Sequence, residues 1–577
     1  MHYTSKELYE FISKETQDPI VEWRTCTLSW AEFPIYQSDL DFYDKISPTF
    51  NGVKYQIPVP TICPEERQRR RLMFRNERKL YKGKCEATGK NIISSYSPDK
   101  KVTVYDQSYR WSDKWNAIDY GREFDFSKSF TEQFGELLQD VPTPNLYNPS
   151  SENCNYINIS LGAKNCYLSY VATHSEEVYF SHWAIYSKRS LDLYRCTNCE
   201  DCYFINGGKN LYACSYSYEL EDSSDCHYSV KLKGCTNCFL CDNLVNKSYC
   251  IQNQQYTKEE YLKQVEALKK EDINRLYMSL LQTTIREATT NYSGEHVYGT
   301  GNFGWKNLVF CSNLDEGEDN KYYEEWAKGL ASCMDCNYGI SSTRSFESLS
   351  PANGHKMLFV YFSVGWENML YSYLCFSCKN CFGCVGLQHK QYCIFNKQYS
   401  KEEYEKLVPK IIEHMQSNGE RWTFFDSSLT PYGYNETIAF EYMPLTKEEA
   451  LARGYKRQDN NYDPIIPDWA TLLTGDQIPT DISIVSDDIL NTIFICEDSK
   501  RPFRIIKQEL DFYRKHKLPL PRKHPDVRHQ IRLDQRPWRS FHLKNCDKCK
   551  KEMISMFPQD YKWTVYCSSC YQQEFYS

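Results

Sequence analysis

The stretch CTNCFLCDNLVNKSYCIQNQQYTKEEY, residues 235–261, occurs a second time as CKNCFGCVGLQHKQYCIFNKQYSKEEY, residues 378–404. The two copies align without a gap at a constant offset of 143, and 17 of their 27 positions are identical. Both space their cysteines as C-x2-C-x2-C-x8-C. Such spacing is typical either of metal ligands or of a repeating scaffold. The sequence on either side helps to choose between them.

Cysteine recurs at intervals of twelve residues around the quoted stretch. Steps of twelve from Cys154 to Cys250 reach nine positions, and seven of them are cysteine. A second array runs back from Cys393 to Cys333 and fades at Lys321. Short apolar segments with polar corners at this period predict strands and turns. Stacked repeats would bury a ladder of small sulfur side chains and expose a ladder of tyrosines.

We therefore expect a mainly β fold with two β-solenoid arrays of twelve-residue period, similar to parallel β-helices. Twelve residues would form one small coil or half of a larger one, and an antiparallel meander is the competing arrangement. Each array is followed by a capping box and a helical pattern, in YTKEEY and YSKEEY. A helix in this place would cover the exposed strand edge, so we expect helical caps.

The two ends of the chain are also related to each other. Residues 85–109 align without gaps with residues 546–570, and residues 63–71 align with residues 524–532. These segments predict duplicated, zinc-ribbon-like α+β end modules. The predicted order is module A with a degenerate zinc ribbon and a basic segment (1–148), array 1 (149–256), a helical cap and linker (257–292), array 2 (293–399), a helical cap (400–419), a linker (420–495) and module B with a four-cysteine zinc ribbon (496–577).

The strongest chemical signal lies near the C-terminus, where two C-x2-C pairs supply Cys546, Cys549, Cys567 and Cys570. Four soft thiolates at this spacing predict a tetrahedral zinc site between the strands of a ribbon. A site of four protein ligands is closed to substrate, so we expect one structural zinc ion.

The counterparts in module A are Cys85, Thr88, Asp106 and Tyr109. Only one of the four cysteines is kept, and Thr and Tyr are poor zinc ligands. We therefore expect a ribbon that folds without metal.

A second metal cluster is conceivable in array 2, where Cys375, Cys378, Cys381 and Cys384 approach the spacing of iron–sulfur ligands. The run lacks the longer last interval and the following proline of such motifs. One cysteine of the run also falls on the twelve-residue ladder, where reduced cysteine serves as a small buried side chain. We favour a structural thiol ladder over a metal site, and disulfides come last.

The net charge of −7 is unevenly distributed. Residues 67–84 carry +8 and residues 501–551 carry +11, which leaves −26 on the rest of the chain. Arginines at helical spacing with interleaved aromatics could follow a phosphate backbone and stack on unpaired bases. The competing interpretation is a helix whose arginines pair with the chain's own acids. The predicted nucleic-acid-binding residues are Arg67, Arg69, Arg70, Arg71, Arg75, Arg78, Lys82, Arg528, Arg532, Arg536, Trp538 and Arg539.

Signals for enzymes, membranes and secretion are weak. The sequence contains no phosphate-binding loop with Gly-Lys-Ser/Thr, no HExxH and no GxSxG. It also has no apolar window of membrane-spanning length and no signal-peptide core at residues 1–18. We therefore expect a cytoplasmic protein with reduced thiols, without a membrane partner and without an evident small-molecule substrate.

Four phrases resemble a known family of large, Cys/Tyr-rich zinc-ribbon proteins from uncultivated bacteria. They are NERKLYKGKCEATGKNIISSYSPDK, WSDKWNAIDYGREFDF, CIFNKQYSKEEYEKLVPKI and LDFYRKHKLPLPRKHPDVRH. The resemblance covers most of the chain, and it implies no particular activity. Glu66 and Thr88 stand where the family sometimes has second knuckle cysteines, so a second zinc is not implied.

The overall prediction is a non-catalytic zinc-binding scaffold that holds nucleic acid or a ribonucleoprotein through its basic end modules. The main alternative is a protein–protein scaffold that uses the solenoid's tyrosine and cysteine faces. A further alternative is an iron–sulfur or redox protein that uses the array cysteines.

Overall fold

The computed structural model describes residues 3–291, 294–325, 327–365, 367–420, 422–459, 466–536 and 540–576, and it leaves out the side chains of 303–305. The chain divides into two compact units, which are described separately. Unit 1 comprises residues 1–146, 287–458 and 538–570, and unit 2 comprises residues 147–286, 459–537 and 571–577. Module A thus belongs to the same unit as array 2, and most of module B to the same unit as array 1.

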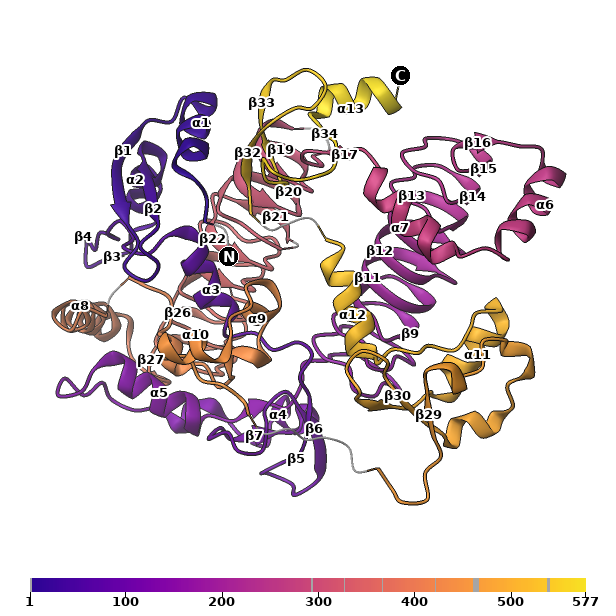
Figure 1. Ribbon diagram of the computed structural model, residues 1–577. Helices are drawn as coiled ribbons and strands as arrows, with labels where there is room; N and C mark the ends of the chain where they lie inside the picture. Colours follow the sequence, from indigo (N-terminus) through magenta and orange to yellow (C-terminus); the bar gives the residue numbers. More distant parts are fainter. Residues whose placement is uncertain are drawn as a thin grey trace. The chain divides into compact units, whose positions relative to one another are not determined.

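Array 1 forms one large sheet in unit 2 (Figure 1). Neighbouring strands are parallel, and paired residues are twelve apart, as in Leu191 with Tyr203 and Tyr203 with Ser215. The predicted mainly β class with large parallel sheets is therefore confirmed, and these strands do not form an antiparallel meander. The strands are β9 (Glu176–Tyr179), β10 (His182–Ile185), β11 (Lys188–Glu200), β12 (Tyr203–Tyr212), β13 (Ser215–His227), β14 (Thr236–Phe239), β15 (Ser248–Ile251) and the antiparallel β16 (Gln254–Gln255).

A three-residue rule explains the cysteine spacing. The backbone turns through a positive φ at nearly every third residue, for example at Asn198 and Asp201. The next residue points inward and is buried, as at Cys199 and Cys202, and the third pairs with the neighbouring strand. C-x2-C-x2-C therefore places cysteines at successive inward positions.

Corner residues in the left-handed region are not restricted to Asn and Asp. Tyr216 and Tyr228 both have positive φ, and their rings stack with centroids 4.7 Å apart at an angle of 9°. A bulky side chain pays a conformational penalty at such a position. Stacking on the equivalent ring twelve residues away offsets part of it, since an aromatic pair contributes about 0.5–1.5 kcal/mol.

An exposed corner gives a direct test of this backbone rule. Asn198 lies in the left-handed region, and its side-chain amide donates to Asn210 Oδ1 at 2.9 Å. We expect Asn198→Val to lower the free energy of unfolding by about 1–2 kcal/mol, because valine is strained there. Asn198→Gly removes the same hydrogen bond without that strain and is the matched control. Equal losses in the two variants, measured by urea unfolding, would contradict the rule.

Array 2 forms the corresponding sheet in unit 1, and its strands continue on the N-terminal side of the point where the cysteine pattern fades. Leu314 pairs with Ala327 and Lys321 with Met334, so the offset is thirteen at this point and not twelve. The extra residue shifts the phase, and for that reason the cysteine pattern fades at Lys321. The strands are β18 (Glu295–Thr300), β19 (Phe303–Ser312), β20 (Leu314–Lys321), β21 (Ala327–Ala331), β22 (Met334–Asn337), β23 (Phe346–Leu349), β24 (His355–Leu358), β25 (Glu367–Leu370), β26 (Lys379–Phe382), β27 (Gln391–Ile394) and β28 (Lys397–Gln398).

Helices follow both sheets at the places that the capping boxes predict. α6 (Lys258–Leu268) begins with a reciprocal Thr257–Glu260 box, and α8 (Lys401–Ser417) begins with the equivalent Ser400–Glu403 box. α6 buries Tyr261 and Val265 in a cluster with aromatic and aliphatic side chains of array 1, and α7 (Ile273–Thr283) joins the same cluster.

The remaining elements belong to the end modules and the linker. None of the helices in the described ranges is long and apolar enough to cross a membrane. In the N-terminal part the helices and strands are α1 (Lys6–Thr16), β1 (Ile20–Thr25), β2 (Glu32–Tyr36), α2 (Gln37–Ile46), β3 (Thr49–Phe50), β4 (Val53–Lys54), α3 (Pro64–Leu72), β5 (Tyr81–Lys84), β6 (Asn91–Ser94), β7 (Val104–Tyr105), α4 (Gln107–Arg110), α5 (Phe130–Asp140) and β8 (Thr143–Pro144). In the C-terminal part they are α9 (Ile438–Tyr442), α10 (Lys447–Ala452), β29 (Leu472–Thr474), β30 (Ile493–Ile495), β31 (Pro502–Phe503), α11 (Lys507–His516), α12 (Pro525–Asp534), β32 (His542–Asn545), β33 (Glu552–Ser555), β34 (Val565–Tyr566) and α13 (Ser568–Phe575).

The predicted tyrosine ladder is largely covered. Tyr179 and Tyr203 of array 1 are buried in a cluster with residues 478–520 of the same unit, and Tyr218 is buried against the helices that follow the array. Tyr186 and Tyr212 are exposed exceptions. Most of the aromatic side chains of array 1 therefore pack against other segments of the same unit.

Candidate metal centre and buried arginine pairs

The four cysteines of the C-terminal ribbon come together at one end of the β32–β33 hairpin. Cys546 follows β32, and Cys567 follows β34. The four sulfur atoms all lie within 4.8 Å of one another, and the Sγ atoms of Cys549 and Cys567 are 3.8 Å apart. Sequence reasoning therefore identified a set of residues that the fold brings together. These residues could hold a metal ion.

Backbone amides stabilise the thiolate of Cys546 in this site. The Cys567 amide donates to Cys546 Sγ at 3.2 Å. Burial opposes ionisation of Cys546, but hydrogen bonds from the amides of Cys567, Cys549 and Lys548 outweigh it and lower the pKa of Cys546 to about 6. Only a thiolate binds zinc, so a lowered pKa favours metal binding at neutral pH. Four thiolates would fill a tetrahedral shell and leave no position for a substrate.

Module A repeats this hairpin with β5 and β6 but not its ligands. The Asp106 amide donates to Cys85 Sγ at 3.2 Å, which reproduces the Cys567–Cys546 contact. The Asp106 carboxylate is occupied as the N-cap of α4, where it accepts from the Ser108 amide at 3.0 Å. Tyr109 packs edge-on against Tyr105. The same backbone arrangement is thus kept by side-chain packing and a helix cap.

The cysteines of array 2 occupy successive inward positions and do not converge. Each thiol donates to backbone carbonyls, as from Cys375 to Cys384 O at 3.5 Å and from Cys384 to Cys393 O at 3.4 Å. Among the described residues, the groups whose ligand atoms lie within 4.8 Å of one another do not include Cys375, Cys378, Cys381 and Cys384. This geometry supports the thiol ladder, and it adds nothing to the metal interpretation.

The basic helix of module A, α3, lies against the array 2 sheet, and three of its four arginines are buried. Arg67 forms an ion pair with Asp335 at 2.8 Å, and Arg71 lies 3.6 Å from the same carboxylate. These three side chains are at most 2% exposed. A guanidinium without access to solvent cannot contact a phosphate backbone. The competing interpretation, pairing with the chain's own acids, describes this helix.

Module B makes the equivalent contact in unit 2. Arg528 lies 3.2 Å and Arg532 lies 2.7 Å from the carboxylate of Asp192. Arg528 and Arg532 correspond to Arg67 and Arg71 at the offset of 461 that relates the end modules. Asp192 corresponds to Asp335 at the offset of 143 that relates the arrays, and both aspartates sit at left-handed corners. Two arginines on one buried corner aspartate therefore occur twice, and we call each set an arginine clamp.

The ring beneath the first arginine is also repeated. The Arg528 guanidinium lies 4.9 Å from the centroid of Phe180, and the Arg67 guanidinium lies 5.5 Å from that of Tyr322. A delocalised cation over an aromatic face gains attraction that grows when water is excluded. Neither aspartate was among the predicted site residues. Their shared offset of 143 was the available signal.

The other predicted nucleic-acid contacts divide into paired arginines, one exposed lysine and two residues outside the described ranges. Arg69 pairs with Glu66, Arg70 with Glu347, Arg75 with Glu77 and Arg78 with Glu441, and Arg536 donates to the Tyr194 hydroxyl. Lys82 is exposed on β5. Trp538 and Arg539 lie outside the described residues. The structure thus places these arginines in contacts within their own unit, and their binding of nucleic acid stays a prediction.

Comparisons with known proteins add little to this picture. No protein family model matches the chain, and no curated protein matches it. One solved structure, a putative acetyltransferase from Desulfovibrio desulfuricans G20, is 10% identical over 48% of this chain and 81% of that one. Its TM-score is 0.10, too low to bear on fold or function.

Proposed function

We propose that this protein is a non-catalytic, zinc-binding scaffold built on two β-solenoids of twelve-residue coils. The observation that carries the proposal is that the four ribbon cysteines gather in one place, while the buried arginines pair with carboxylates of their own unit. The four ribbon cysteines would complete the coordination of one metal ion, and each arginine clamp satisfies a buried carboxylate. Parallel strands paired at intervals of twelve support the solenoid architecture.

The partner that we propose is nucleic acid, bound through the exposed lysines of the ribbon hairpin in place of the buried arginines. Lys548, Lys550 and Lys551 are exposed around the cysteine site. Tyr561 and Trp563 lie in the segment between β33 and β34, with ring centroids 5.0 Å apart. Lysines and aromatic rings in one ribbon are suited to a single strand, whose phosphates pair with lysine while its bases stack.

Fluorescence anisotropy with short RNA and DNA oligonucleotides at rising salt tests this partner. We expect binding to weaken steeply with salt, and Lys548→Gln/Lys550→Gln/Lys551→Gln to reduce the log–log salt slope by up to about 2, since each single-strand phosphate contact contributes roughly 0.7. Lys401→Gln/Lys406→Gln/Lys410→Gln removes the same charge from exposed positions of α8 in the same unit and is the matched control. Absent binding at low salt, or equal losses in both variants, would refute a nucleic-acid site on the ribbon.

A further inference from the structure

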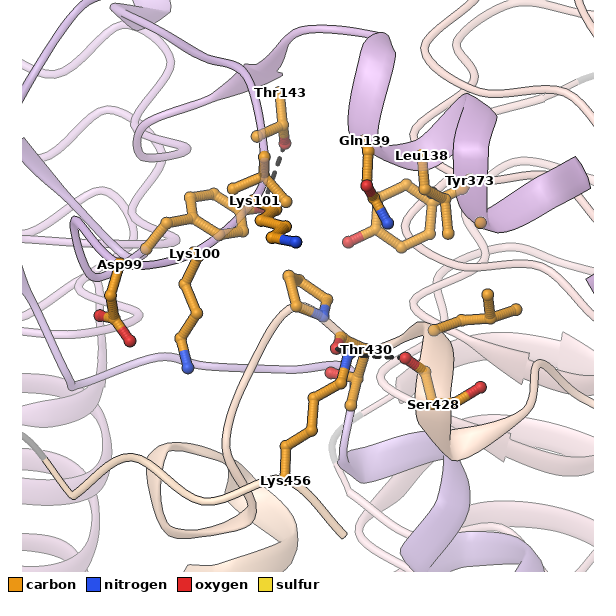
Figure 2. Close-up of a pocket in the computed structure, with 15 residues that line it drawn as sticks. Asp99, Lys100, Lys101, Leu138, Gln139, Thr143, Tyr373, Ser428, Thr430 and Lys456 are labelled. Carbon is orange, nitrogen blue, oxygen red and sulfur yellow. Dashed lines mark hydrogen bonds between the residues drawn. The ribbon is translucent and has the colours of Figure 1, made fainter. Parts of the chain in front are cut away.

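Unit 1 contains a cavity of about 290 Å³ that shares no lining residue with the metal centre or the arginine clamps (Figure 2). One side is formed by α5 and the segment around β8, another by residues 96–102, and a third by the loop 428–431. Its size is at the lower end for small-molecule sites. Its polar and aromatic lining includes Tyr96, Lys100, Lys101, Gln139, Tyr373 and Lys456.

The lining carries an excess of positive charge. Lys100, Lys101 and Lys456 line the cavity, against a single carboxylate, Asp99. The Asp99 carboxylate accepts from Gln458 Nε2 at 3.0 Å, and Lys100 lies 3.2 Å from Glu436. Because Glu436 neutralises Lys100, a net charge of about +1 remains at the cavity. Excess cations in a recess with protein walls attract a small anion.

Lys456 is held in place by the chain, while Lys101 extends from an exposed position. The Lys456 ammonium donates to Ser428 O at 2.6 Å and to Thr430 O at 2.8 Å, which uses two of its three N–H groups. Burial and the nearby charge of Lys100 lower the pKa of Lys456. In Figure 2 the Lys101 ammonium, the Gln139 amide and the Tyr373 hydroxyl point toward the same part of the cavity.

Aromatic rings supply an apolar wall. Tyr96 and Tyr373 are both buried, and Tyr96 is fixed by stacking on Tyr432 at 5.2 Å and by a 3.1 Å hydrogen bond between its hydroxyl and Thr143. A flat ligand can pack against such a ring without inducing a rearrangement. The cavity thus combines fixed aromatic surface with polar donors at one end, the usual composition of a ligand site.

We infer that this cavity binds a small aromatic anion, with its acidic group at Lys101 and Gln139 and its ring against Tyr373. The inference stands independently of the scaffold function, because none of these residues contributes to the metal site, the clamps or the ribbon lysines. The acidic group could be a carboxylate or a phosphate, because both accept hydrogen bonds from ammonium and amide donors.

Calorimetric titration of the full chain with four matched probes tests the inference. Benzoate and phenyl phosphate carry a ring and an anion, inorganic phosphate lacks the ring, and phenol lacks the charge. We expect saturable binding of benzoate or phenyl phosphate that is at least tenfold tighter than that of inorganic phosphate or phenol. Equal affinity for phenyl phosphate and inorganic phosphate would overturn the aromatic part, and no saturable binding of any probe would overturn the site.

Two cavity variants and one control, all at exposed positions, locate the binding in the cavity. Lys101→Gln removes one cation and is expected to weaken binding at least tenfold, whereas Lys90→Gln, on an exposed turn of the same unit, should leave it unchanged. Gln139→Trp places a bulky ring at the cavity mouth and is expected to abolish binding. Equal weakening by the two lysine variants would mean that binding reflects net charge alone, and unaltered binding in Gln139→Trp would place it elsewhere.

Discussion

Replacing Asp335 with alanine is expected to lower the free energy of unfolding of unit 1 by about 3–5 kcal/mol, because it leaves the buried charges of Arg67 and Arg71 uncompensated. Asp192→Ala should have a smaller effect on unit 2, because Arg528 keeps a second carboxylate, Glu509 at 3.3 Å, and only Arg532 loses its partner. Urea unfolding followed by tryptophan fluorescence and circular dichroism measures both. In each variant, only the unfolding transition of the affected unit should move to a lower urea concentration, because the two clamps belong to different units.

An exposed ion pair provides the control. Lys269 and Glu266 lie 2.6 Å apart with more than half of each side chain exposed, so Glu266→Ala should cost less than about 1 kcal/mol. The triple variant Arg67→Met/Arg71→Met/Asp335→Leu should regain most of the stability that Asp335→Ala loses, since apolar side chains can replace a buried ion pair. A loss below 1 kcal/mol in Asp335→Ala would show that the clamp does not hold module A on its sheet.

The sequence predicts the repeating part of this molecule well because a period is visible in one dimension. Cysteine at intervals of twelve reports strand pairing directly, and the capping boxes at Thr257 and Ser400 report where helices begin. Both features depend on neighbours in the sequence or on a constant spacing. The ribbon cysteines could also be predicted, because the C-x2-C spacing by itself is typical of metal ligands.

The groups that the arginines contact could not be predicted in the same way. A row of cations on a helix looks the same whether it faces phosphate or a buried carboxylate, and only the tertiary contact distinguishes the two. Asp192 and Asp335 gave no local signal, since acidic residues are common at turns. The phase shift in array 2 had a similar effect, because one additional residue moved the inward positions and ended the twelve-residue cysteine pattern at Lys321.

Loss of a single ribbon cysteine is expected to remove the bound zinc. Cys549 is exposed, so Cys549→Ser introduces no buried polar group, yet it removes one of four ligands. Zinc binding supplies about 10–16 kcal/mol of apparent free energy in small zinc-binding folds, and much of this should be lost from the hairpin. Elemental analysis should give one zinc per chain for the natural protein and none for the variant. Hydrogen exchange should accelerate at residues 542–555 while β11–β13 stay protected.

The matched control is Cys378→Ser in array 2. Cys378 is buried and its thiol donates to Phe376 O at 3.4 Å, a hydrogen bond that a serine hydroxyl can also make. If the array cysteines form only a packed ladder, the variant keeps the same zinc content as the natural protein. If Cys375, Cys378, Cys381 and Cys384 ligate a cluster, the variant loses metal and an iron–sulfur absorption band disappears. The two variants together therefore separate a chain with one structural metal from a chain in which both cysteine runs bind metal.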